Sequence, residues 1–122
     1  MFRLATSIST SGTSLRVIIR LRPSDLLRIF GPPEPGDHYQ VSGCYTFTDQ
    51  HGEVFTVYES RSTTLYWHDT GENFPTPEEF WNSNELEEMG IGGRTDASEF
   101  IKWFVRQIGE CQILFNFDRK SV

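Results

Sequence analysis

Residues 39–59 read Tyr39-Gln40-Val41-Ser42-Gly43-Cys44-Tyr45-Thr46-Phe47-Thr48-Asp49-Gln50-His51-Gly52-Glu53-Val54-Phe55-Thr56-Val57-Tyr58-Glu59. Large side chains at 39, 41, 45 and 47 alternate with smaller or polar ones, which is the period of a strand with one buried face. Asp49-Gln50-His51-Gly52 is typical of a hairpin turn, and a strand rich in β-branched residues returns over 53–59. The sequence therefore predicts an α+β fold whose antiparallel sheet is built round this central hairpin.

Further elements are predicted on both sides of the hairpin. Pro23-Ser24-Asp25 opens a short helix, and Thr76-Pro77-Glu78-Glu79 has the cap, proline and acids of a helix start. Apolar residues recur at helical spacing between residues 95 and 108, which predicts a C-terminal helix packed on one face of the sheet. The expected elements are strands at 2–9, 15–21, 86–92 and 111–117 and helices at 25–30, from 76 or 77 to 81 or 82, and at about 95–108.

Composition limits the function. The chain has 122 residues, which predicts a single domain over 1–122, and its aromatic content of 14% is too high for a disordered acidic tail. Seventeen acids against eleven bases give a net charge of -6, which disfavours duplex nucleic acid as a partner. The sequence has no apolar run long enough to cross a membrane, and two cysteines predict no disulfide framework. A soluble intracellular protein is expected.

The charges are unevenly distributed along the chain. Residues 1–30 carry five arginines and one acid, whereas residues 69–99 carry nine acids and only Arg94 as a base. One interpretation is that the basic and acidic segments balance each other within the fold. The others are self-association through complementary surfaces, or arginines that line an anion site, since a guanidinium group forms forked contacts with carboxylates and phosphates.

No catalytic or metal-binding motif stands out. The histidines, His38, His51 and His68, lack the helical spacing of a zinc pair, and no phosphate loop or nucleophile elbow is present. We therefore expect no metal and no cofactor. As an enzyme, the protein would need a general acid or base to cleave a cyclic phosphodiester, and His38 or His68 is then the best candidate.

Two segments are candidates for ligand binding. Gly90-Ile91-Gly92-Gly93-Arg94-Thr95 precedes the last helix, and reads either as a glycine-rich turn with a capping box or as an anion-facing turn that uses Gly92, Gly93 and Arg94. Arginine and rings also interleave further upstream, where they suit either core packing or the sandwiching of a base beside phosphates. The residues that this second reading uses are Tyr58, Arg61, Tyr66, Trp67 and Trp81.

Trp103 lies off the apolar stripe of the last helix, among Asp96, Glu99 and Gln107. A tryptophan on a polar face usually finds a second surface. That surface is either a loop of the same chain or a second subunit.

Several short motifs together resemble a small domain common in phage genomes, whose pattern runs F-G-x-P, G-D-x-Y-K, an acidic hairpin ending in D-G, Y-x-x-K and I-G-G. The resemblance covers about residues 28–93, with Gln40 and Arg61 in place of lysines and His51-Gly52 in place of D-G. Arg61 keeps a positive charge, whereas Gln40 does not. The matching motifs are Phe30-Gly31-Pro32-Pro33, Gly36-Asp37-His38-Tyr39-Gln40-Val41, Asp49-Gln50-His51-Gly52, Val57-Tyr58-Glu59-Ser60-Arg61 and Ile91-Gly92-Gly93.

This resemblance implies a phage accessory protein that acts against host defence in the cytoplasm of the infected cell. Some small phage proteins of this size sequester cyclic nucleotides that serve as alarm signals, and these are typically oligomers. The leading hypothesis is therefore a non-catalytic homo-oligomer that binds a cyclic nucleotide or a cyclic ADP-ribose type of signal, with Arg61 and Arg94 on phosphates and Tyr66, Trp67 or Trp81 on a base. The alternative is an acidic protein, mimicking nucleic acid through residues 69–99, that inhibits a host defence enzyme.

Overall fold

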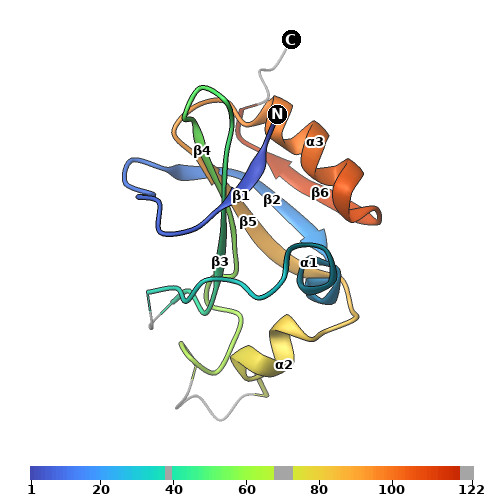
Figure 1. Ribbon diagram of the computed structural model, residues 1–122. Helices are drawn as coiled ribbons and strands as arrows, with labels where there is room; N and C mark the ends of the chain where they lie inside the picture. Colours follow the sequence, from blue (N-terminus) through green and yellow to red (C-terminus); the bar gives the residue numbers. More distant parts are fainter. Residues whose placement is uncertain (38–39, 68–72, 119–122) are drawn as a thin grey trace.

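The computed structural model describes residues 1–37, 40–67 and 73–118, and it confirms the α+β fold. Its strands form one six-stranded antiparallel sheet in the order β1-β3-β4-β5-β2-β6 (Figure 1). The strands are β1 (Arg3–Ala5), β2 (Ser14–Leu21), β3 (Cys44–Thr48), β4 (Val54–Tyr58), β5 (Glu87–Gly93) and β6 (Cys111–Asn116), and the helices are α1 (Pro23–Phe30), α2 (Pro77–Trp81) and α3 (Ser98–Ile108).

The predicted hairpin is present as β3 and β4, with Tyr45 opposite Val57 and Phe47 opposite Phe55. It is shorter than predicted. The first strand begins at Cys44 rather than at residue 39, because Gly43 packs against the ring of Trp81 and residues 40–43 bend away from the ladder. Tyr39 lies outside the described residues. The return strand ends at Tyr58, one residue before the predicted end.

One face of the sheet carries the hydrophobic core. Alternate residues of β2, β3, β4 and β5 point toward α1 and α3, and Phe47 touches the rings of both Phe100 and Phe104 in α3. Phe100 also stacks on Phe55 with ring centroids 5.0 Å apart. Burying each such side chain contributes about 1.5–3 kcal/mol. The helix-facing strand residues are Val17, Ile19, Leu21, Tyr45, Phe47, Phe55, Val57, Met89 and Ile91.

The short helix α2 forms as the sequence predicts. Thr76 precedes Pro77, its hydroxyl accepts a hydrogen bond from the Glu79 amide, and the Glu79 carboxylate accepts one from the Thr76 amide. These reciprocal bonds satisfy amide groups that a helix start otherwise leaves unpaired. They also lower the pKa of Glu79. Phe80 and Trp81 point inward, so α2 closes the end of the core beside α1.

The last helix begins at Ser98, three residues later than the earliest predicted start. Residues 94–97 form an irregular link from β5, and Gly109 ends the helix with a left-handed φ of 81°. No helix in the described part of the chain is both long enough and apolar enough to span a bilayer.

Candidate functional site: a hydroxyl-lined cleft on the open face of the sheet

The second face of the sheet is not covered by a helix. In Figure 1 the loop between β1 and β2 (blue) lies on the side of the central strands away from α1 and α3. This loop, residues 34–37 and Val41 border a cleft of about 460 Å³ above β3, β4 and β5. Pockets for small molecules have volumes of roughly 300–1,000 Å³, so the cleft has the capacity for a ligand of nucleoside size.

Hydroxyl groups dominate the chemistry of the cleft. Thr46 and Thr56 lie opposite each other on β3 and β4, and both are 4% exposed. Tyr58 follows on β4, and burial raises the pKa of its phenol. The described lining consists of Ile8, Thr10, Thr13, Ser14, Leu15, Glu34, Pro35, Gly36, Asp37, Val41, Cys44, Thr46, Thr56, Tyr58 and Gly92.

The charged groups of the cleft are acidic. Glu34 and Asp37 line it, and none of the described lining residues is basic. Burial raises the pKa of the Cys44 thiol, and the negative charge of Glu34 acts in the same direction. The cleft therefore favours a neutral or positively charged group over a bare phosphate.

The strand period explains why this face is polar. Side chains alternate between faces, so the same strands that send Tyr45, Phe47 and Val57 into the core place Thr46 and Thr56 on the other side. Gly92 on β5 keeps the floor of the cleft low. A Cβ atom at this position would lie 2.6 Å from the Thr56 hydroxyl oxygen, so a larger residue would displace the threonine.

The loop between β1 and β2 is held in place by side-chain contacts at both of its ends. Its Ser7 amide donates to the Glu34 carboxylate at 3.2 Å, which ties the loop to the opposite wall of the cleft. Further along, the Arg94 guanidinium donates to the carbonyl oxygens of Ser9 and Ser11 at 2.9 and 2.7 Å. Arg94 thus stabilises the loop that forms one wall of the cleft. It is not among the described lining residues.

A buried carboxylate organises the other wall. The Glu59 side chain is fully buried, and it accepts hydrogen bonds from the amides of Ser42 and Ser62 at 3.0 and 2.7 Å, and from the Ser42 hydroxyl. The Trp81 indole N–H donates to the same hydroxyl at 3.0 Å. Glu59 therefore connects the segments before β3 and after β4 to helix α2, at the point where the chain leaves the cleft.

The sequence-predicted binding residues do not form one site. Tyr58 and Gly92 line the cleft. Arg61, Tyr66 and Trp67 form a separate cluster after β4, in which the Arg61 guanidinium lies 5.5 Å from the Tyr66 ring centroid. Within that cluster Trp67 stacks on Phe74 at 5.2 Å.

The arginine of that cluster is engaged with the rest of the chain. Arg61 adopts a left-handed φ of 61°. Its amide and its guanidinium both donate to Gln40, to the carbonyl at 2.7 Å and to the side-chain oxygen at 3.1 Å. Gln40 precedes Val41, which lines the cleft, so Arg61 supports a wall of the cleft without entering it.

Two other predicted site residues belong to the core side of the sheet. Trp81 is 6% exposed and touches the rings of Tyr45 and Phe80 edge-on. Gly93 is buried, and a Cβ atom there would lie 2.9 Å from the Phe55 ring. The glycine-rich segment is therefore not a turn at a helix start. Gly90, Gly92 and Gly93 are part of strand β5, where they make room for side chains of the neighbouring strand β4.

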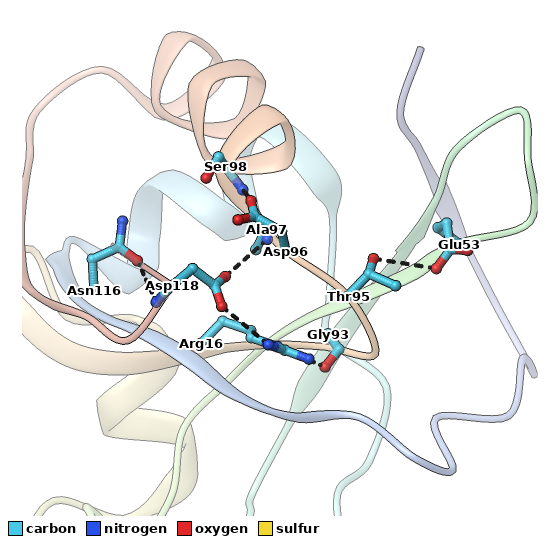
Figure 2. A network of polar contacts seen from close by, with 9 residues as sticks. All are labelled: Arg16, Glu53, Gly93, Thr95, Asp96, Ala97, Ser98, Asn116 and Asp118. Carbon is cyan, nitrogen blue, oxygen red and sulfur yellow. Dashed lines mark hydrogen bonds and ion pairs between the residues drawn. The ribbon is translucent and has the colours of Figure 1, made fainter. Parts of the chain in front are cut away.

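The start of α3 does attract an anion, and that anion belongs to the same chain. Figure 2 shows that the Asp118 carboxylate accepts a hydrogen bond from the Ala97 amide at 3.0 Å and forms an ion pair with Arg16 at 3.0 Å. The Arg16 side chain also donates to the Gly93 carbonyl at 3.1 Å. Asp118 thus supplies the negative charge that a helix N-terminus favours, and Arg16 takes the role that the sequence suggested for Arg94.

Trp103 packs within its own chain. Its ring lies 5.6 Å from Phe2 and 5.7 Å from Phe47, and it remains half-buried. The N-terminal segment before β1 therefore provides the second surface that we predicted for Trp103. A subunit contact through Trp103 stays a prediction.

The acidic stretch is spread over several elements. Glu78 and Glu79 lie in α2, Glu87 and Glu88 in β5, and Glu99 in α3, where it pairs with Lys102 at 3.3 Å. In Figure 1 α2 and the start of α3 lie at opposite ends of the sheet. This dispersion differs from the single flat acidic surface that mimicry of nucleic acid requires.

The cleft depends on residues that sequence reasoning missed: Glu34, Asp37, Thr46, Thr56 and the buried Glu59. The threonines were detectable as the polar half of the hairpin period, but their role depends on the loops that cover them. His38 and His68, the candidate general acid or base, lie outside the described residues. Within the described ranges, no group of three metal-ligating side chains comes together.

A scan of the sequence against models of known protein families gives no match, and a search of curated proteins gives none either.

Proposed function

We propose that the protein is a non-catalytic binding protein that sequesters a small nucleotide-derived signal, and that the nucleoside part of this ligand occupies the open-face cleft. The observation that carries the proposal is the 460 Å³ cleft with its hydroxyl lining. Ribose hydroxyls and base edges are both donors and acceptors, so they match threonine, serine and tyrosine hydroxyls. Following the phage resemblance, the biological role would be to lower the free concentration of an immune signal in an infected cell.

The acidic groups determine how such a ligand would be oriented. Glu34 and Asp37 disfavour a phosphate inside the cleft, so the phosphates would face solvent while the uncharged part is buried. Arg61 and Arg94 support the two walls through Gln40, Ser9 and Ser11, and they would act by keeping the cleft open rather than by holding phosphates. This assigns the predicted arginines a positioning role.

Isothermal titration with cyclic dinucleotides, cyclic ADP-ribose isomers and the corresponding nucleosides tests the proposal. We expect binding of at least one member, with the nucleoside retaining part of the affinity. Recovery of the ligand unchanged after denaturation supports sequestration over cleavage. Absence of binding across the panel, on folded protein, contradicts the proposal.

A matched pair of variants tests the location of the site. Thr46 and Thr48 lie two residues apart on the same face of β3, but only Thr46 lines the cleft. Thr46→Val removes one hydroxyl from the floor, and the loss of one hydrogen bond predicts about tenfold weaker binding. Thr48→Val is expected to bind as the unmodified protein does. Equal effects of the two substitutions would place the ligand elsewhere.

A further inference from the structure

The open face continues beyond the cleft as an apolar surface on β2 and β6. Phe115 of β6 lies opposite Ile18 of β2, and Ile18 lies opposite Gly90 of β5. Phe117 follows Phe115 on the same side, with ring centroids 4.7 Å apart. Phe115 and Phe117 are 57% and 52% exposed. Large rings this exposed on neighbouring positions indicate an interaction surface.

A hollow lies beside these rings. It has a volume of about 190 Å³ and is lined by Leu15, Ile18, Tyr58, Ser60, Ser62, Glu88, Met89 and Gly90. Gly90 creates it, because the Tyr58 ring and the Leu15 side chain lean over a position without a side chain. The face therefore carries both a projecting aromatic side chain and, next to it, a depression with apolar and polar lining residues.

We propose that this surface, defined by Leu15, Ile18, Gly90, Phe115 and Phe117, is the interface between two copies of this chain. A twofold arrangement brings the same surface of each copy together, so that each Phe115 enters the hollow of the other copy. A second copy uses both at once, which is why the self-complementary shape favours it.

Charge at the margin of the surface fits the same arrangement. Arg20 of β2 lies opposite Glu88 of β5, and both side chains are exposed on the face that carries Ile18 and Gly90. In a twofold pair, Arg20 of one copy can face Glu88 of the other, and the reverse. The residues of β6 from Cys111 to Asn116 carry no charge, so no like charges oppose one another there.

The exposed rings supply part of the apolar area that a dimer interface needs. If each aromatic side chain offers roughly 150–250 Å², the exposed parts of Phe115 and Phe117 give on the order of 200 Å² per copy, and the exposed part of Leu15 adds to this. A standard interface covers about 800 Å² per partner, of which a little over half is apolar. The strand β6 bulges between its pairings with Ile18 and Ile19, so it is not a regular edge for pairing with another strand. Face-to-face packing of two sheets does not require such an edge.

Sedimentation of the full chain over a range of concentrations tests the proposal. We expect the unmodified protein to reach the mass of a dimer, and Phe115→Asp to weaken association by at least about 100-fold. Leu4→Asp, at the opposite edge of the sheet and 39% exposed, is the control and is expected to dimerise normally. A monomer at every concentration, growth beyond a dimer, or a dimer that Phe115→Asp leaves intact would overturn the proposal.

Reversal of charge gives a second test that leaves Phe115 in place. Arg20→Glu is expected to weaken the dimer, and Arg20→Glu combined with Glu88→Arg is expected to restore it, since each copy then offers the reversed pair. If the double variant associates no better than the single one, these residues do not face each other across the interface.

Discussion

The two faces of the sheet differ although they are made by the same strands. Thr46 and Phe47 are neighbours in β3, yet Phe47 lies among the rings of α3 whereas Thr46 lies at the floor of the cleft. On the helix side, large apolar groups pack closely against one another. On the other side, loops cover small polar residues and leave a space. One face thus carries the hydrophobic core, and the other carries the cleft in which we propose that a ligand binds.

Truncation of neighbouring residues on the two faces should separate these roles. Phe47→Ala leaves a cavity beneath α3, and we expect a loss of about 3–5 kcal/mol in the free energy of unfolding. Thr46→Ala should cost about 1 kcal/mol. Urea unfolding of both variants measures the difference. Similar losses for the two residues would mean that the open face contributes to stability as much as the core does.

A buried and an exposed carboxylate should contribute differently to stability. Glu59 is buried and accepts three hydrogen bonds. Glu59→Ala leaves these donors without their acceptor, and we expect a loss of about 2–4 kcal/mol in the free energy of unfolding. Glu59→Gln keeps one acceptor oxygen and should cost less. Glu78→Ala, on the exposed side of α2, is the control and should change the unfolding free energy by less than about 0.5 kcal/mol. A Glu59→Ala variant as stable as Glu78→Ala would contradict the role of Glu59.

The cap of α3 has a smaller expected effect. Asp118→Ala removes both the acceptor of the Ala97 amide and the partner of Arg16, and we expect a loss of about 1–2 kcal/mol. Asp118→Asn keeps a hydrogen-bond acceptor and should lose less. Chemical denaturation of the two variants provides the test, and a fully stable Asp118→Ala protein would show that α3 does not need this cap.

Much of this fold follows from local patterns. The hairpin period, the proline and acids at Thr76–Glu79 and the apolar stripe before Gly109 each determine one element from nearby residues. The cleft does not follow in this way, because it joins Glu34, Thr46, Thr56 and Gly92, which come from four separate segments. Tyr58 and Gly92 were identified from their residue types alone.

The arginines illustrate why residue type alone does not predict a binding site. Arg61 and Arg94 have the chemistry of phosphate ligands, but their long side chains also suit backbone carbonyls, and the fold offers them Gln40, Ser9 and Ser11. Asp118 occupies the helix start at which one of the two sequence interpretations placed an external anion. Only the tertiary arrangement decides whether such a group binds a partner within the chain or a ligand from solution.

A smaller effect is expected for the alkylation rate of the Cys44 thiol, which lines the cleft. Burial raises its pKa, so at pH 8 it should hold less thiolate and react with iodoacetamide more slowly than an ordinary cysteine. Its rate should keep rising above about pH 8.5, where an unperturbed thiol is half ionised. The Cys111→Ser variant isolates this signal, and the same variant unfolded in urea should react at the ordinary rate. Equal rates in the folded and unfolded states would contradict a covered position for Cys44.

Protection of Cys44 is also the most direct test of the cleft as the binding site. Alkylation of the Cys111→Ser protein is followed while the tightest ligand from the titration panel is added. We predict that the rate at Cys44 falls in proportion to the bound fraction, and that Thr46→Val shifts this curve to about tenfold higher ligand concentration. Saturation with ligand while the rate at Cys44 stays unchanged would contradict binding in the cleft.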